Sequence, residues 1–421
     1  MRIFLSTILV MSTFFMMRGP ARADIFDTYS FDAQGLAMAG ARSASVDNLS
    51  ALYYNPAGLA MVEDHALNLS YLYTYAKLDV SGADTPVPDD SDLRGGTVIF
   101  SLGLDINKLI NISRPATFAL ALSMKDDGTM VQLEDLEETE FTYIKYGSAL
   151  ARSVIYFGLG VEAIKDVLTI GLGAHSMIGG EVAATMTMDA EDLSTTQEVI
   201  PSKQNFWMKM EMKPYPIIGI KLTPTKDLSL GFTYRDGIKV EMDPFLADIA
   251  LTLGSHAAHI KAYTAILSFM QPSSYQAGAA YRLGDVTVEG DLNYERWSEF
   301  KLSVPREMRR LTPELDDVLS YRLGLEYRLT NMKLWAGYQY TPTPLPDDMN
   351  GAHYLDADRH IFGFGAGTSA KDPWGVLPKP VELSAAIQEK YLPEKTFRSE
   401  GTTYSLKGNV LCGTVSFKLS F

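Results

Sequence analysis

Between residues 321 and 329, apolar side chains alternate strictly with positions that are charged or glycine. Successive side chains of an extended strand point to opposite faces, so one face of this stretch is apolar and the other is charged. The charged face needs water, whereas a soluble barrel of ordinary size fills its interior with apolar side chains. An apolar outside around a wet, charged inside predicts a transmembrane β-barrel. The apolar face carries Tyr321, Leu323, Leu325, Tyr327 and Leu329, and the other face carries Arg322, Gly324, Glu326 and Arg328.

The same period of two recurs along most of the chain after residue 62, for example over 67–75, 228–235 and 286–295. It also governs the last stretch, 411–421, which ends on the aromatic residue Phe421. Over one such stretch, a half-buried strand of a soluble β protein would explain the pattern nearly as well. The repetition along the chain favours the barrel, and we expect Phe421 to be the signal that the barrel assembly machinery reads during insertion.

The spacing of these stretches predicts an antiparallel barrel of about fourteen strands, an even number. Connections at 165–166, 225–226, 284 and 330–331 are tight, and they alternate with long ones. Such alternation is typical of short periplasmic turns and long external loops, although 106–114 and 370–378 are long for turns. The predicted strands are 64–79, 95–105, 115–125, 149–163, 167–186, 203–223, 227–242, 273–283, 285–300, 317–329, 332–342, 358–369, 379–391 and 403–421.

Residues 1–23 have the features of a cleaved signal peptide. Arg2 provides a positive charge, residues 3–17 are almost wholly apolar, and residues 21–23 form a small-x-small cleavage site. No later apolar run reaches the length of a transmembrane helix. The formal charge of -14 argues against nucleic acid as a partner, because nucleic acid binding needs a basic surface. The only cysteine, Cys412, excludes an intramolecular disulfide.

Residues 24–62 differ from the barrel that we expect over 63–421, because they lack strand alternation and are rich in small residues. Glycine and alanine allow close backbone approach, and the run Asn55, Pro56, Ala57, Gly58 contains two pairs that are common in turns. We interpret this segment as an N-terminal hatch of short helices inside the barrel. Asn55 and Pro56 would cap a hatch helix and fix its turn, which is compatible with a role in gating.

The predicted external loop 243–272 is unusually apolar, and its apolar residues recur at helical spacing with a break at Gly254. An apolar helical pair in such a loop either packs on the barrel mouth or offers an apolar surface to a ligand. His256 and His259 lie near Ser255 in this loop, but no third metal ligand, nucleophile elbow or zinc-protease motif accompanies them. We therefore expect no metal, no cofactor and no enzymatic activity.

The hatch and several strands resemble the FadL/TodX (OMPP1) family of outer-membrane transporters for long-chain fatty acids and other hydrophobic compounds. In the hatch, the resemblance rests on Gly35, Gly40, Asp47, Ser50, Ala51 and the run 54–59, which includes the Asn-Pro-Ala element. In the barrel it rests on 230–235, 291–300, 321–328, 338–346 and 355–360. The resemblance covers nearly the whole mature chain and is most specific in the hatch and in 285–360.

The resemblance implies passive uptake of hydrophobic small molecules without ATP, in the bacterial outer membrane. Cargo would land on an external apolar groove, pass to a lumen pocket, and leave sideways into the bilayer through a wall opening gated by the hatch. The partners implied are fatty acids or hydrocarbons, outer-membrane lipid and lipopolysaccharide, and a monomer is expected. By position, the groove candidates are Phe245, Leu246, Ile249, Leu253, Ile260, Tyr263 and Leu267.

A carboxylate cargo would need a cation in the lumen. Four arginines lie at strand positions whose side chains are expected to point into the lumen. Most of them are expected to pair with Glu289, Asp291, Glu295 and Glu326 as part of the wall. The candidate arginines are Arg235, Arg282, Arg322 and Arg328.

A structural or adhesive barrel without transport, and a barrel lipid hydrolase, stay open as alternatives. A general porin fits less well, because residues 24–62 look suited to filling its lumen.

Overall fold

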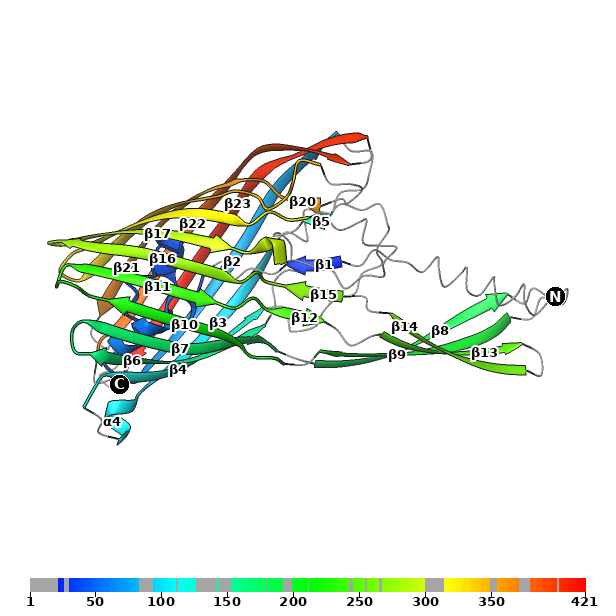
Figure 1. Ribbon diagram of the computed structural model, residues 1–421, viewed down its shortest axis with the longest axis horizontal. Coiled ribbons are helices and arrows are strands. Elements are labelled where there is room, and N and C mark those ends of the chain that lie inside the picture. Colours follow the sequence, from blue (N-terminus) through cyan, green and yellow to red (C-terminus); the bar gives the residue numbers. More distant parts are fainter. Residues whose placement is uncertain are drawn as a thin grey trace.

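The fold is taken from a computed structural model of the chain (Figure 1). The residues it describes are 22–25, 30–82, 94–110, 113–125, 142–143, 153–178, 180–191, 199–210, 212–241, 245–253, 256–264, 267–299, 314–348, 354–370, 379–399 and 401–421.

Fourteen strands of the described chain form a closed antiparallel barrel in sequence order, which confirms the predicted fold class. The last strand closes the barrel against the first, from Ala66 opposite Ser420 to Ser81 opposite Ser405. The barrel strands are β2 (Ala66–Ser81), β3 (Arg94–Asp105), β4 (Ala116–Lys125), β6 (Val154–Ile164), β7 (Leu168–Met177), β10 (Tyr215–Leu222), β11 (Leu228–Arg235), β16 (Ser274–Leu283), β17 (Val286–Glu295), β18 (Val318–Arg328), β19 (Met332–Thr341), β21 (Arg359–Ala370), β22 (Val381–Ser399) and β23 (Thr402–Ser420).

The two faces of the barrel wall follow the alternation of the sequence. In β18, Tyr321 and Leu323 are 51% and 47% exposed, whereas Ser320 and Glu326 are 0% and 4% exposed. Large apolar side chains on the outside of many barrel strands are exposed in the same way. In a bilayer, this outer face contacts lipid and the polar face points to the lumen.

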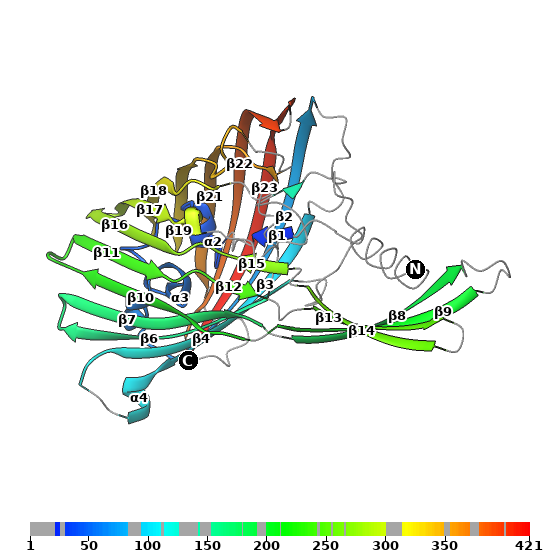
Figure 2. The same cartoon turned by 45° about the vertical axis from the view of Figure 1, so that its right-hand side comes forward.

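The lumen is occupied by three short helices, α2 (Ala33–Ala37), α3 (Ala51–Tyr54) and the 3₁₀ helix η1 (Pro56–Met61). Figures 1 and 2 show α2 and α3 within the barrel. The Asp32 carboxylate caps α2 by accepting the Gly35 N–H at 2.7 Å. Asn55 caps η1 in the same way through the Ala57 N–H at 3.1 Å, and Pro56 occupies the first turn, where no N–H is needed.

Wall glycines let the backbone of these helices approach the strands very closely. A Cβ on Gly171 would lie 2.1 Å from the carbonyl carbon of Pro56, and one on Gly337 would lie 2.3 Å from that of Met38. Glycines stand opposite one another on neighbouring strands, as in Gly160 with Gly171 and Gly337 with Gly363. The lumen segment therefore fits the barrel because these wall positions carry no side chain.

Several shorter elements complete the described chain. β8 (Gly180–Glu191), β9 (Val199–Met210), β13 (Phe245–Leu253) and β14 (His256–Thr264) form a sheet that projects beyond one end of the barrel in Figures 1 and 2. β12 (Lys239–Glu241) and β15 (Leu267–Met270) pair with each other, and β15 also pairs with β1 (Arg22–Ile25). The remaining elements are β5 (Thr142–Tyr143), β20 (Tyr354–Leu355), α4 (Ile106–Ile110) and η4 (Trp297–Glu299). Among the described helices, none combines the length and hydropathy of a membrane span.

The structure corrects two expectations about the external end. The predicted strands 167–186 and 203–223 each divide into a barrel strand and a strand of the projecting sheet. The predicted helical pair at 243–272 is wrong, because β13 pairs with β14 from Phe245 opposite Thr264 to Leu253 opposite His256. β13 also pairs with β9, so its backbone groups are bonded between strands rather than along a helix. A short apolar run is compatible with the spacing of a helix or of a strand, and pairing with a distant segment determines that this one forms a strand.

Candidate functional site

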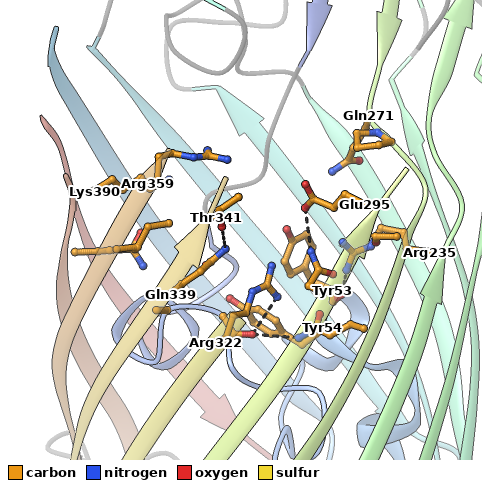
Figure 3. A pocket seen from close by; sticks show the side chains of 18 of the residues that line it. Tyr53, Tyr54, Arg235, Gln271, Glu295, Arg322, Gln339, Thr341, Arg359 and Lys390 are labelled. Carbon is orange, nitrogen blue, oxygen red and sulfur yellow. Dashed lines mark hydrogen bonds between the residues drawn. The ribbon is translucent and has the colours of Figure 1, made fainter. Parts of the chain in front are cut away.

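The lumen segment with α2, α3 and η1 is called the hatch below. A pocket lies inside the barrel, between this hatch and the end of the barrel that carries β12 and β15. It encloses about 940 Å³ not filled by atoms, part of it open to solvent. Its walls come from the hatch on one side and from β11, β16, β17, β18, β19, β21 and β22 on the other (Figure 3). The sequence segments that line it are far apart, so only the closed barrel brings them together.

The charged side chains of this pocket are mostly cationic. Among the described residues, Arg235, Arg322, Arg359 and Lys390 line it, together with one carboxylate, Glu295. Glu295 accepts hydrogen bonds from the amide of Asn293 at 3.0 Å and from the indole of Trp297 at 2.8 Å. In Figure 3, Arg359 and Lys390 lie across the pocket from Arg235. This arrangement can receive an anionic group, because opposite charge and several N–H donors converge there.

Arg235, the last residue of β11, contacts the hatch. Its guanidinium donates a hydrogen bond to the carbonyl oxygen of Tyr53 and lies 4.2 Å from the centre of the Tyr53 ring. The Nε of Arg235 is buried and has no hydrogen-bond partner among the described residues. The side chain is therefore held by a cation–π contact and a single carbonyl, with a donor left over.

Arg322, on β18, contacts the hatch at the turn that follows α2. Its Nη1 donates to the carbonyl oxygen of Gly40 at 3.3 Å, and Gln276 donates to the same oxygen at 3.3 Å. Gly40 has a φ of +78°, and a Cβ there would lie 3.4 Å from the Arg322 guanidinium carbon. The Nε of Arg322 is also buried without a partner in the part of the chain that the structure describes.

The other two predicted arginines lie elsewhere. Arg282 is exposed near the turn that ends β16, and Arg328 pairs with Glu326 at 2.5 Å. Neither lines the pocket. The sequence analysis missed Arg359 and Lys390, which also line the pocket. Each lies on the lumen-facing side of its strand, Arg359 two residues before the pocket-lining Ile361 and Lys390 two residues after the pocket-lining Gln388.

Two carboxylates of β17 bind the hatch backbone, which differs from their expected role as partners of the arginines. Asp291 accepts the N–H groups of Arg42 and Ser43, each at 3.1 Å, and the Ser43 hydroxyl at 3.0 Å. Glu289 accepts the N–H groups of Ala44 at 2.7 Å and the next residue at 3.2 Å. Four consecutive backbone donors of the hatch are thus satisfied by two acids of the wall. We call this contact the β17 clamp.

The predicted gate residues Asn55, Pro56, Ala57 and Gly58 are buried where the hatch meets β7 and β10. The Asn55 amide donates to the carbonyl oxygen of Ser43 at 2.7 Å and to that of Ile220 at 3.1 Å. Asn55 therefore ties two parts of the hatch to each other and to the wall, in addition to capping η1. These contacts place the Asn-Pro-Ala element at an anchoring point.

Burial and charge perturb two ionisable groups of the hatch. Burial alone would lower the pKa of Arg42, but the carboxylates of Asp32, Asp47 and Glu289 outweigh it and hold that pKa above its usual value. Arg42 is fully buried, with Asp47 3.7 Å away. Burial is also the main cause that raises the pKa of Tyr54, which lines the pocket, to about 12. Arg42 is therefore charged and Tyr54 neutral at physiological pH.

The groove candidates fall on two strands of the projecting sheet and on β15, rather than on a helical pair. Phe245, Leu246, Ile249 and Leu253 belong to β13, Ile260 and Tyr263 to β14, and Leu267 begins β15. Ser255, of the Ser-His-His cluster, lies outside the described residues. The structure as described contains no group of three histidine, cysteine, aspartate or glutamate side chains that could hold a metal ion.

Comparison with known proteins identifies relatives over most of the chain. The model of the family described as "Outer membrane protein transport protein (OMPP1/FadL/TodX)" matches residues 14–376. Alkane uptake protein A of Marinobacter nauticus is 22% identical over 420 residues, covering 93% of this chain and 90% of that protein.

Solved structures share the fold. A Pseudomonas aeruginosa FadL homologue superimposes with a TM-score of 0.62 at 15% identity, over 94% of this chain and 99% of that one. The monoaromatic hydrocarbon channel CymD gives 0.55 at 16% identity, with coverage of 94% and 99%. The Pseudomonas putida toluene transporter TodX gives 0.53 at 15% identity, again with 94% and 99%. At these identities the structures support the architecture alone.

Proposed function

Because the chain belongs to the OMPP1/FadL/TodX family of outer membrane transport proteins, we propose that it takes up long-chain fatty acids or other hydrophobic molecules passively. It is a protein of the bacterial outer membrane and a transporter rather than an enzyme. The proposal divides the chain into a signal peptide (1–23), a hatch (24–62) and a barrel (63–421). Cargo crosses from an external groove to the lumen pocket and leaves through the wall when the hatch permits it.

The observation that carries this proposal is the cationic pocket above the hatch. A fatty acid has an apolar chain and a carboxylate, and four cationic side chains with one engaged carboxylate suit that head group. We assign head-group binding to Arg235 and Arg322, with Arg359 and Lys390 completing the positive lining. Arg282 and Arg328 have no part in this assignment, because neither borders the pocket.

An uncharged hydrocarbon is the second candidate cargo. It is favoured by the relatives, since one is named an alkane uptake protein and another a toluene transporter. Such a cargo would make no use of the cations, so its uptake would not depend on Arg235 or Arg322. The two candidates therefore differ in a property that substitution can measure.

The route through the protein follows from how the lumen is filled. The hatch occupies it, and glycines of the wall touch the hatch backbone. A straight path to the periplasm would also carry an apolar chain along a polar lumen, which is unfavourable. A sideways exit into the bilayer avoids both obstacles. We propose that the Asn55–Gly58 segment gates this exit, and that the apolar residues of 245–267 receive cargo outside.

Uptake of radiolabelled oleate and hexadecane by cells lacking their own outer-membrane transporter tests the function. The wild-type protein is compared with an empty vector, with the double variant Arg235→Gln and Arg322→Gln, and with Arg282→Gln as a matched control outside the pocket. Heat-modifiable gel migration confirms that each barrel is folded. We expect oleate uptake to be lost only in the double variant.

The outcomes separate the candidates. Hexadecane uptake that survives the double substitution, without any oleate uptake by the wild type, would support the hydrocarbon assignment. A folded wild-type barrel that imports neither compound would refute transport of both classes, and an adhesive barrel or a lipid hydrolase would then be the better hypotheses.

A further inference from the structure

Four amide side chains of the pocket have an oxygen to which no described residue donates a hydrogen bond. We infer that these oxygens accept the hydroxyl groups of a sugar, and that the pocket holds the head group of an anionic glycolipid. Such a molecule joins an apolar chain to a sugar that carries a carboxylate. The assignment rests on the proposed function, because it takes the pocket as the place where cargo is held, and it narrows the class of cargo. The four amides belong to Gln271, Gln276, Asn293 and Gln388.

Three of these amides are oriented by the partner of their nitrogen. Gln276 and Asn293 donate to carboxylates of β17 at 2.6 Å and 3.0 Å, and Gln388 donates to a hatch carbonyl at 2.8 Å. Ionised carboxylates and carbonyl oxygens only accept hydrogen bonds, so the amide nitrogen has to face them. The amide oxygen of each side chain is therefore left as an acceptor in the pocket lining.

Gln271, which precedes β16, has the most isolated acceptor of the four. The residue is 7% exposed, and its buried side-chain oxygen has no hydrogen-bond partner among the described residues. Figure 3 shows this side chain at the edge of the pocket, above Glu295. A buried acceptor without a donor is costly, so a hydroxyl group that enters the pocket would gain a hydrogen bond and relieve that cost.

A simple fatty acid cannot use these acceptors. An ionised carboxylate has no hydrogen to donate, and neither an acyl chain nor an alkane provides a donor. A hydroxyl group both donates and accepts, so a head group with several hydroxyls can satisfy several amide oxygens at once. The unused hydrogen-bonding capacity of the lining therefore favours a sugar over a bare carboxylate.

The polar lining also extends over more of the wall than a carboxylate can contact. Arg235 on β11 and Lys390 on β22 are six strands apart along the barrel, in the order β11, β16, β17, β18, β19, β21, β22. Neighbouring strands lie about 4.8 Å apart, so this is about 29 Å along the wall. Figure 3 shows the two side chains on opposite sides of the pocket. A sugar ring contacts more of this lining than the two oxygens of a carboxylate do.

Aliphatic side chains form a small part of the lining. Among the described residues they are Ala39, Pro272 and Ile361. Pockets that enclose apolar ligands are lined predominantly by hydrophobic side chains, with a small number of polar groups. The described lining has the opposite composition, so it suits the polar head of an amphiphile better than its chain.

The cations of the pocket account for the charge of the head group. Arg235 and Arg322 border the same space as the amides, and a guanidinium binds both oxygens of a carboxylate. A neutral glycolipid would satisfy the amide oxygens and leave the cations without a counter-charge. An acidic sugar satisfies both sets of groups.

Binding of three amphiphiles with the same dodecyl chain tests the assignment. Dodecyl glucuronide carries hydroxyls and a carboxylate, dodecyl glucoside carries hydroxyls alone, and tridecanoate carries a carboxylate alone. Each radiolabelled compound is equilibrated, below its micellar concentration, with the purified mature protein in lipid nanodiscs, and binding to empty nanodiscs is subtracted. A typical net hydrogen bond changes an affinity about 5-fold, so two bound hydroxyls should make the glucuronide bind about 30-fold more tightly than tridecanoate.

Substitutions separate the two sets of groups. Gln271→Leu removes the isolated acceptor and breaks no side-chain hydrogen bond to a described residue. It should weaken both sugar amphiphiles about 5-fold and leave tridecanoate unchanged. The double variant Arg235→Gln and Arg322→Gln should weaken the glucuronide and tridecanoate but not the glucoside. Asn68→Leu, which removes a lumen-side amide of β2 outside the pocket, is the matched control and should leave all three affinities unchanged.

The comparison of the three compounds needs only the wild-type protein, so it stands even if a variant does not fold. A glucuronide that binds no more tightly than tridecanoate refutes the sugar assignment and leaves the uptake of fatty acids intact. A glucoside that binds as tightly as the glucuronide refutes the requirement for an acid. Unchanged affinity for both sugar amphiphiles in a folded Gln271→Leu variant refutes the role of the amides. A folded wild-type protein that binds none of the three refutes the assignment, and the separate uptake of oleate and hexadecane then decides whether the proposed function fails as well.

Discussion

Gly171 offers the sharpest test of how the hatch is held. A Cβ at this position would lie 2.1 Å from the carbonyl carbon of Pro56, 2.2 Å from the nitrogen of Ala57 and 2.5 Å from the carbonyl oxygen of Pro56. All three atoms belong to backbone, which cannot rotate away as a flexible side chain would. The substitution Gly171→Ala should therefore displace the start of η1 or bend β7, at a cost of about 1–3 kcal/mol, the usual range for overpacking.

Gly413 on β23 provides the matched control, because a Cβ there would meet no atom within 4 Å. Replacing a strand glycine by alanine at an open position removes the entropic penalty of glycine, so Gly413→Ala should be neutral or stabilising by about 0.5–1 kcal/mol. Both glycines lie in barrel strands, so the two substitutions make the same chemical change. They differ only in what the new methyl group meets.

Guanidinium titration of the refolded protein in lipid vesicles gives the free energy of unfolding of both variants, and hydrogen exchange reports on residues 55–61. We expect Gly171→Ala to lower the free energy of unfolding and to accelerate exchange in 55–61, and Gly413→Ala to do neither. Equal behaviour of the two variants would refute the reasoning, because it would mean that the hatch does not press on the wall at Gly171.

Three further predictions concern the anchors of the hatch. Asn55→Ala removes the amide that bonds two buried carbonyls and caps η1, so the free energy of unfolding should fall by about 1–3 kcal/mol per carbonyl left unsatisfied. Asp291→Asn should accelerate exchange at 42–45 more than at 55–58, since it weakens the β17 clamp; the reverse order would contradict the clamp. Hydrogen bonds from Lys108 and Lys379 hold the pKa of Asp64 below its usual value of 3.8, so their stabilisation is complete above about pH 4 and is lost as the pH falls through the lowered pKa. Heat-modifiable gels should show a lower melting temperature for Asp64→Asn than for the wild type at pH 7, and a smaller difference at pH 3.

The barrel was predictable from sequence because its signal is local and repeated. In β18 the alternation from Tyr321 onward specified which side chains meet lipid, and the exposed fractions agree. The strand phase also placed Arg235 and Arg322 in the lumen correctly. The predicted face of the strand could not distinguish these two arginines from Arg282 and Arg328, because the position of a residue along the barrel axis decides whether it borders the pocket.

The external end was harder to predict because pairing between distant segments decides its structure. The apolar residues of 245–270 fit a helical period, but the segment forms β13, β14 and β15. β13 finds its partner in β9, about forty residues earlier in the chain, through pairs such as Leu246 with Trp207. Propensity and spacing do not contain that information, because the competing conformation is stabilised only after the partner strand is in place.

The polar lumen raises the question of why a channel for hydrophobic cargo is lined with charge. The hatch consists of short helices and turns, so many of its backbone N–H and C=O groups have no partner within it. Wall side chains bond them: Asp291 and Glu289 bind four N–H groups, and Gln388 donates to the carbonyl oxygen of Leu36 at 2.8 Å. Much of the lumen polarity therefore serves the hatch and says nothing about cargo.

What remains informative about cargo is the sign of the charge in the pocket. The acids of the β17 clamp bind backbone N–H groups, and Glu295 is engaged by Asn293 and Trp297. Four cations line the pocket, and two of them, Arg235 and Arg322, also donate to hatch carbonyls. If the lumen were polar only to hold the hatch, acids and bases would be expected to balance at its open surface. Two of the four cations also bond the hatch, but the described lining still carries more cations than carboxylates, and this excess of positive charge is the feature that bears on cargo. Replacing Arg235 and Arg322 should therefore affect the uptake of oleate and of hexadecane differently.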